Sequence, residues 1–326
     1  MINNIINKRG SKIILLAGIG SLFLLTFPLW STPWFTHIFI VIFLNIVLAV
    51  SYRLLYITGL GSFCHISFYA IGAYTSAILL TRLGLPFGVG FLAAGIVAAL
   101  ASLLLGWPAM RTRGAYFFIV SFGFFVIFYA ILMNWFELTG GYAGIMQIPP
   151  VLSSITTGAL KPNYYLILAF CAVTILIMYR LDKSRYGQEL YAIGDAENLA
   201  EVVGINILRH RLFAFGLGAM FAGFAGSMHA SYYAYIAPPA FSMITTIIIL
   251  AWVVVGGSQK LWGPIVAAVA LTLFAELLRM SGPLSGILYG VVLFIFVMTM
   301  PRGVVGAVDS FRARFRKHES LYETTK

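Results

Sequence analysis

The sequence predicts an all-α polytopic membrane protein, and three observations lead to this fold class. Hydrophobic residues make up 61% of the 326 residues and charged residues only 10%, whereas a soluble domain carries about 25% charged residues. The apolar residues are gathered into long runs, and the basic residues lie between these runs. A soluble fold of this size would lack a solvated surface, so lipid must cover much of the chain.

A membrane-spanning helix needs roughly 20 apolar residues, and ten runs approach this length. The first run follows a basic N-terminus and no A-x-A cleavage site follows it, so it is interpreted as a retained span rather than a signal peptide. The eighth and ninth runs are short and could be tilted or partly re-entrant, which leaves eight spans as an alternative. The ten runs are Ile13–Trp30, Phe35–Ser51, Phe63–Thr81, Phe87–Trp107, Ala115–Trp135, Tyr164–Tyr179, Leu212–Tyr232, Phe241–Val255, Ile265–Leu278 and Leu284–Met300.

The basic residues predict the orientation of the spans. If the N-terminus is cytoplasmic and the ten runs alternate, 18 of the 21 Lys and Arg residues lie on the cytoplasmic side, and only Arg82, Lys161 and Arg279 lie outside. Basic residues are retained in the cytoplasm during insertion. Residues 1–326 are therefore expected to form a single transmembrane domain with both termini inside, a long cytoplasmic loop at 180–211 and a basic cytoplasmic tail at 301–326.

Pairs of small residues indicate where helices approach closely, because packing of small side chains holds helices together in lipid. They occur in the third and seventh runs as Gly72/Ser76, Ala73/Ala77, Gly218/Ala222, Ala219/Gly223 and Ala222/Gly226.

Few residues could carry chemistry. The sequence has no metal-type Cys/His cluster, no H-E-x-x-H and no phosphate-binding G-x-x-x-x-G-K-[ST] loop. Glu276 is the one acid inside an apolar run, and Arg279 three residues later predicts a structural ion pair. His65 and His229 are expected to be satisfied buried histidines. Without such motifs, neither enzyme activity nor a bound metal or cofactor is expected. Nucleic-acid binding is not expected either, because topology explains the net charge of +11.

The loop at 180–211 differs from the rest of the chain. It holds five of the ten acidic residues. Asp195 is predicted to cap a helix that begins at Ala196 and ends at Gly204. The apolar residues of this helix are too many for a freely solvated loop, so it is expected to dock onto a partner, or alternatively to pack on its own bundle; they are Leu199, Ala200, Val202 and Val203.

In its ordered motifs the chain resembles the permease subunits of branched-chain amino acid ABC importers, in the second of their two paired types. The resemblance extends over nearly the whole chain. The motifs are GLGSFCHISFYAIGAYTSA (Gly59–Ala77), RTRGAYFFIVSFGF (Arg111–Phe124), LTGGYAGI (Leu138–Ile145), SRYGQELYAIGDAENLAEVVGINILRHRLFAF (Ser184–Phe215), VVVGGSQKLWGPIVAA (Val253–Ala268) and MPRGVVG (Met300–Gly306).

The resemblance implies a location in the bacterial inner membrane and a set of partners. These are a sister permease that completes the pore, two cytoplasmic ATPases that use the ATP, and an extracytoplasmic binding protein. It also implies an ATPase-coupling loop at Asp195, Ala196, Glu197, Asn198, Leu199, Ala200, Glu201 and Gly204. The general E-A-A-x-x-x-G motif of ABC importers is only half present there, because Glu197 sits one residue early relative to Gly204.

Two glycine-rich stretches are candidates either for the translocation pathway and its flexing or for tight helix packing and turns. The candidate pathway residues are Gly59, Gly61, Ser62, His65, Gly256 and Gly257. The family serves branched-chain amino acids, other amino acids, urea and short amides. The alternative function is a self-sufficient secondary carrier or channel, which should show acids or inverted repeats near the membrane midplane; neither is seen.

Overall fold

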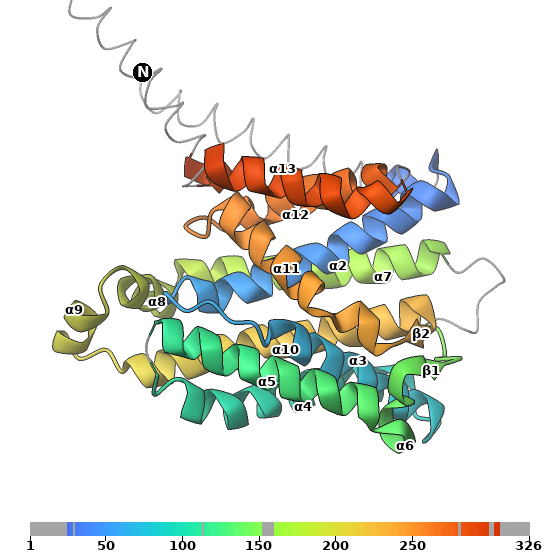
Figure 1. Cartoon of the computed structure of the whole chain (residues 1–326), viewed down its shortest axis with the longest axis horizontal. Helices are drawn as coiled ribbons and strands as arrows, with labels where there is room; N and C mark the ends of the chain where they lie inside the picture. Colours follow the sequence, from blue (N-terminus) through green and yellow to red (C-terminus); the bar gives the residue numbers. More distant parts are fainter. Residues whose placement is uncertain are drawn as a thin grey trace, which may run out of the picture.

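The computed structural model describes residues 25–28, 30–112, 114–151, 160–279, 282–299 and 303–306. Most of them form a bundle of helices (Figure 1). The helices are α2 (Pro33–Tyr56), α3 (His65–Thr81), α4 (Phe87–Ala109), α5 (Ala115–Asn134), α6 (Phe136–Thr139), α7 (Leu160–Lys183), α8 (Arg185–Asp195), α9 (Glu197–Val202), α10 (Ile207–Tyr233), α11 (Met243–Gly256), α12 (Trp262–Arg279) and α13 (Ser285–Thr299). Short 3-10 helices are η1 (Gly141–Ala143), η2 (Pro238–Phe241) and η3 (Gly282–Leu284).

The prediction of an all-helical polytopic membrane protein is confirmed. Nine of the ten predicted runs coincide with α2–α5, α7 and α10–α13. Seven helices in the described part are long and apolar enough to cross a membrane, whereas α3 and α13 are shorter, with 17 and 15 residues. The predicted span Ile13–Trp30 and the predicted tail at 301–326 lie largely outside the described residues.

The helical units that contain the eighth and ninth runs are longer than the apolar runs themselves. Helix α11 itself has 14 residues, but η2 precedes it, and the unit Pro238–Gly256 reaches 19 residues. Helix α12 begins at Trp262 and has 18 residues. Both units are therefore long enough for a full span.

Helices α2, α3 and α10 form the core of the bundle. In the most apolar part of α2, 83% of the residues are buried, whereas in the corresponding parts of α4 and α5 only 28% and 22% of the residues are buried. Helices α4 and α5 lie along one side of the bundle, and α12 and α13 lie along the opposite side (Figure 1). The outer helices expose large apolar side chains such as Leu104 and Ile119, as expected of surfaces that lipid covers.

The predicted small-residue contacts are found between α3 and α10. A Cβ at Gly72 would lie 2.2 Å from the carbonyl oxygen of Gly223, and a Cβ at Gly226 would lie 2.1 Å from that of Tyr69. Beside them the Ser227 hydroxyl donates a hydrogen bond of 2.8 Å to the Ser76 oxygen. These two helices pack through their backbones, which larger side chains would prevent.

The two ends of the bundle carry different structures. Helices α8 and α9 project from one end, and α6 with a two-stranded antiparallel pair lies at the other (Figure 1). The strands, β1 (Ile145–Met146) and β2 (Tyr235–Ile236), pair in the register Ile145↔Ile236 and Met146↔Tyr235. This pair, which no pattern in the sequence predicts, ties the loop after α5 to the end of α10.

Candidate functional site

The segment between α7 and α10 folds into two short helices rather than one. Ser184 caps α8, because its hydroxyl accepts a 3.2 Å hydrogen bond from the Gly187 amide. The turn that precedes α8 is tight, since a Cβ at Gly187 would lie 2.2 Å from the carbonyl oxygen of Leu181. Leu190 and Ile193 of α8 are buried against the bundle. The apolar pattern of the sequence does not predict this helix.

The predicted start of the second helix was wrong. Asp195 is the last residue of α8, and Ala196 occupies the N-cap position of α9 without a side-chain hydrogen bond. The physical reason is that α8 continues through Asp195 and gives it a helical backbone, whereas an N-cap needs a non-helical one. The extended residue is Ala196, with φ −154° and ψ 82°, so α9 begins at Glu197.

The predicted end of α9 at Gly204 is confirmed. Gly204 has φ +88°, its amide donates to the Glu201 carbonyl, and the Ile205 amide donates to the Ala200 carbonyl, both at 3.0 Å. This pair of hydrogen bonds is the Schellman arrangement, in which a left-handed residue ends a helix. Glycine adopts that conformation without the steric cost of a Cβ.

Helix α9 presents apolar side chains to the outside. Ala200 faces the bundle and is 3% exposed, whereas Leu199, Val202 and Val203 are 69%, 83% and 74% exposed. We call the last three residues the α9 apolar patch. Of the other residues in the predicted coupling set, Asp195, Asn198, Glu201 and Gly204 are also exposed, and Ala196 and Glu197 are half-buried. The helix is thus packed on its own bundle through one face and free on the other.

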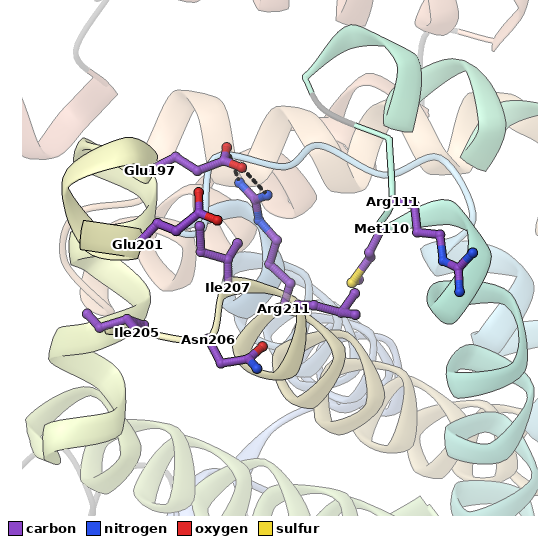
Figure 2. A pocket seen from close by; sticks show the side chains of 9 residues that line it. Met110, Arg111, Glu197, Glu201, Ile205, Asn206, Ile207 and Arg211 are labelled. Carbon is purple, nitrogen blue, oxygen red and sulfur yellow. Dashed lines mark hydrogen bonds and ion pairs between the residues drawn. The ribbon is translucent and has the colours of Figure 1, made fainter. Parts of the chain in front are cut away.

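Arg211 of α10 anchors α9 to the bundle. It forms a two-pronged ion pair with Glu197, at 2.9 and 3.1 Å, and it donates a 3.2 Å hydrogen bond to the Thr58 carbonyl. A cleft of about 430 Å³ opens beside this pair (Figure 2). It is lined by Met110, Arg111, Glu197, Glu201, Ile205, Asn206, Ile207, Leu208 and Arg211.

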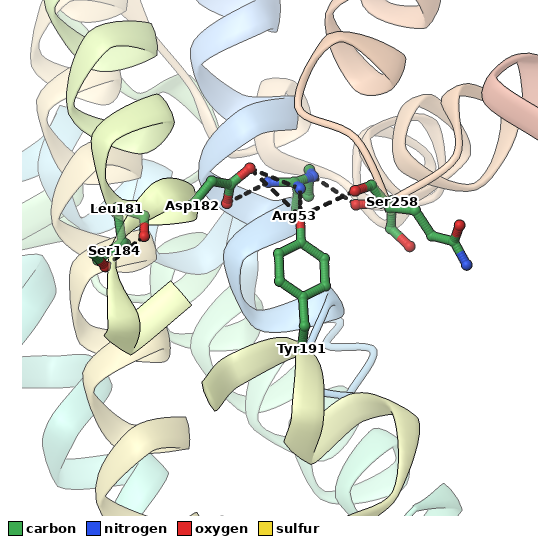
Figure 3. Close-up of polar contacts among 7 residues, drawn as sticks. Arg53, Leu181, Asp182, Ser184, Tyr191 and Ser258 are labelled. Atoms are coloured by element: carbon green, nitrogen blue, oxygen red, sulfur yellow. Dashed lines mark hydrogen bonds and ion pairs between the residues drawn. The ribbon is translucent and has the colours of Figure 1, made fainter. Parts of the chain in front are cut away.

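Arg53 of α2 anchors α8 and the end of α7 (Figure 3). It pairs with both carboxylate oxygens of Asp182, at 3.0 and 3.1 Å, and its Nε donates to the Ser258 carbonyl at 2.7 Å. Its Nη2 also donates to the Tyr191 hydroxyl, which itself donates to the Gln259 carbonyl at 3.1 Å. Burial raises the pKa of Tyr191 above its ordinary value, so this hydroxyl keeps the proton that it donates.

The first glycine stretch lies at the same end of the bundle. Gly59 has φ +81°, and it faces Gly194 of α8, where a Cβ would lie 2.0 Å from the Ile57 carbonyl oxygen. The Ser62 amide donates to the Tyr52 hydroxyl at 3.1 Å. These contacts make the stretch a site of close backbone packing between α8 and the turn after α2. Two other predicted residues lie here. A Cβ at Gly61 would lie 3.5 Å from the Phe118 ring, and the His65 ring is hydrogen-bonded to the Ser51 hydroxyl at 3.0 Å.

The second glycine stretch is packed equally closely. A Cβ at Gly256 would lie 2.4 Å from the Gly263 backbone. Gly257 has φ +87°, and a Cβ at Gly303 would lie 2.6 Å from its amide nitrogen. The turn between α11 and α12 is therefore held against the residues that follow α13.

The remaining ionisable candidates behave as structural residues. Arg279 and Glu276 form the predicted ion pair at 3.1 Å. The ring of His229 packs against Tyr69, Tyr233 and Phe241. Among the described residues there is no group of three or more His, Cys, Asp or Glu side chains placed to hold a metal ion.

Four residues of this site were missed as functional candidates: Arg53, Asp182, Tyr191 and Arg211. The two arginines had been counted only as topology markers. One signal was available in the sequence. Arg53 is the single charged residue between Phe35 and Gly61, in a stretch that is otherwise mostly apolar. Its partners lie 129 to 205 residues away in the chain, so no local pattern identifies them.

The described helices define a multi-pass α-helical membrane protein. Residues 35–297 match the family described as the permease component of the branched-chain amino acid transport system. The chain belongs to this family of ABC-type permeases, whose members are non-catalytic membrane subunits.

Relatives support this assignment. The chain is 32% identical over 294 residues to the high-affinity branched-chain amino acid transport system permease proteins LivM of Escherichia coli and Salmonella typhimurium, which covers 83% of this chain and 68% of each relative. It is 26% identical over 289 residues to the permease protein LivH of E. coli, which covers 80% of this chain and 90% of LivH. No solved structure matches the chain. As a homologue of LivM it is a multi-pass protein of the bacterial inner membrane.

Proposed function

We propose that the chain is the LivM-like member of a permease pair in an ATP-driven importer of branched-chain or related amino acids. The relatives named LivM and LivH both carry the name of one transport system, and this chain is more similar to LivM. A LivH-like sister permease would complete the translocation pathway, and an extracytoplasmic binding protein would deliver the amino acid. The whole chain would form one permease domain.

The observation that carries the coupling role is the orientation of α9. Glu197 is turned inward onto Arg211, whereas the α9 apolar patch is exposed together with the polar residues Asn198 and Glu201. A surface helix that exposes its apolar side chains to water is unfavourable unless a partner covers them. We assign the cover to a cytoplasmic ATPase, which would use the ATP. The coupling segment would be Asp195 to Gly204, with the contact made chiefly by Leu199, Val202 and Val203.

The basic residues support a cytoplasmic position for α8 and α9. Along the described helices Arg53, Arg111, Lys183 and Lys260 lie at or beside helix ends on the α8–α9 side, whereas Arg82, Lys161 and Arg279 lie at the opposite ends. Retention of basic residues in the cytoplasm would then place both termini inside, with ten spans in all. A cysteine at Val202 should react with a membrane-impermeant maleimide from the cytoplasmic side of sealed vesicles; reaction from the outside would refute this orientation.

The translocation pathway would lie at the interface with the sister permease. The stretches Gly59–Ser62 and Gly256–Gly257, with His65 beside the first, would flex as the pathway opens to either side. The close contacts of both stretches with neighbouring backbones support their role as turns whose movement shifts the attached helices.

Uptake by the complete transporter tests the proposal. Vesicles that contain this chain, the sister permease and both ATPases should accumulate a radiolabelled branched-chain amino acid when they are given the binding protein and internal ATP. Omission of the ATPases should abolish uptake. Uptake that survives this omission and instead requires an ion gradient would favour the alternative, a self-sufficient secondary carrier.

A further inference from the structure

Two buried arginines contact the α8–α9 segment, Arg53 from α2 and Arg211 from α10. Arg53 is 1% exposed and Arg211 is 3% exposed. Each holds the α8–α9 segment with one part of its guanidinium and a glycine-containing turn with another. Arg53 binds Asp182 and Tyr191 as well as the Ser258 carbonyl. Arg211 binds Glu197 as well as the Thr58 carbonyl.

The burial of these arginines makes their contacts hard to break. A buried charge that loses its partner is strongly unfavourable, and the planar guanidinium presents donors in fixed directions. Movement of α9 away from the turn after α2 would leave the buried Arg211 without Glu197, and movement of α8 would take the Tyr191 hydroxyl away from Arg53. Movement of the segment and movement of the turns are linked.

Tyr191 makes the most direct connection. Its hydroxyl accepts from Arg53 and donates to the Gln259 carbonyl at 3.1 Å, so α8 is bonded to the turn between α11 and α12. On the same helix Gly194 packs against Ile57, with no room for a Cβ between them. Helix α8 thus contacts both turns, one through the Tyr191 hydroxyl and the other through backbone packing.

We propose that Arg53, Asp182 and Tyr191 form a transmission node, in which these positioning residues carry movement of α8 and α9 to the turns at 57–62 and 256–260. The inference rests on the proposed function, because it assigns a route to the energy that α9 would receive from the ATPase. The node joins α2, the end of α7, α8 and the α11–α12 turn (Figure 3). Loss of the node should leave ATP hydrolysis active but less effective in moving substrate.

The variant Tyr191→Phe tests the node, because it removes one hydroxyl and keeps the ring. We expect normal assembly with the ATPases, continued ATP hydrolysis, and a roughly tenfold fall in amino acid transported per ATP hydrolysed, which is the lower end of the range expected for loss of the hydrogen bond between this hydroxyl and the charged Arg53 guanidinium. The matched control is Tyr186→Phe on the same helix. The Tyr186 ring stacks on His210 at 4.3 Å, and its hydroxyl makes no hydrogen bond within the described part of the chain, so this variant should keep the wild-type ratio.

Asp182→Asn provides a second variant, because it removes the charge that faces Arg53 and keeps the shape of the side chain. It should lower the same ratio. A wild-type ratio in Tyr191→Phe overturns the proposal. The proposal is also overturned if, in both variants, uptake and ATP hydrolysis fall only in proportion to the amount of assembled complex. The node would then have only a structural role. Failure of ATP-driven uptake by the wild-type transporter is a different result, which overturns the proposed function itself.

Discussion

The α9 apolar patch gives a quantitative prediction for Val202→Ser. Val202 is 83% exposed in the isolated chain, and complete burial of a valine or leucine side chain contributes about 1.5–3 kcal/mol. Burial of the exposed part of Val202 by an ATPase would therefore contribute about 1–2 kcal/mol. Since 1.4 kcal/mol corresponds to a factor of ten, Val202→Ser should weaken ATPase binding by roughly five- to thirtyfold.

The assay is a titration of the purified permease pair in lipid nanodiscs with the labelled ATPase. The control is Met146→Ser, because Met146 is 62% exposed but lies in β1 at the other end of the bundle. That variant should bind the ATPase as the wild type does. An affinity for Val202→Ser within twofold of the wild type would refute the assignment of the patch to the ATPase. An equal loss in both variants would show a general effect on folding rather than on docking.

Two further predictions concern the bundle itself. Gly72→Leu should lower the thermal unfolding temperature of the purified protein sharply and reduce its yield, because the added side chain would overlap Gly223 of α10. Gly123→Leu, on a helix position where a Cβ meets nothing within 4 Å, should leave both unchanged, and equal effects would contradict this packing argument. Glu276→Gln should keep ATP-driven uptake near the wild-type level, because Arg279 is 71% exposed and an exposed pair contributes at most about 1 kcal/mol. Abolished uptake in a stable Glu276→Gln protein would instead place Glu276 in the transport mechanism.

The sequence predicted most of the helical bundle because lipid exposure imposes long apolar runs. Helix α4 was predicted from Phe87 and begins there, and the backbone contact of Gly72 with Gly223 follows from the small-residue spacing. The prediction was poorest where no lipid is involved. Helix α8 has only 11 residues and mixes polar and apolar side chains. It therefore contains no long apolar run that would identify it in the sequence. Its continuation through Asp195 displaced the predicted cap.

The candidate site was only partly predictable for a different reason. Gly204 could be identified because a helix end in the left-handed conformation favours glycine at one local position. Arg53 could not be assigned a role, because its partners Asp182, Tyr191 and Ser258 are brought to it by three other parts of the chain. Contacts of this kind depend on how the helices pack, which the apolar pattern of each helix does not specify.

The charges of the loop after α7 explain why α9 is suited to docking. A surface helix of a soluble protein buries its apolar side chains and exposes its charges. Here three of the loop's acids bind basic side chains: Asp182 pairs with Arg53, Glu189 with His210 and Glu197 with Arg211. These pairs tie the segment to α2 and α10, so three of the loop's five acids are turned toward the bundle.

The apolar side chains of α9 are then left on the outer face. Helix α9 spans only six residues, too few to be stable in water without tertiary contacts, so its shape depends on the Glu197–Arg211 pair and on the hydrogen bonds around Gly204. A partner that covers Leu199 and Val202 would therefore push on a helix whose firm attachments, among the described residues, lead into the bundle. On the proposed function, that arrangement would direct the force toward the turns held by Arg211 and Arg53 and would give the permease a physical route for receiving work from another chain.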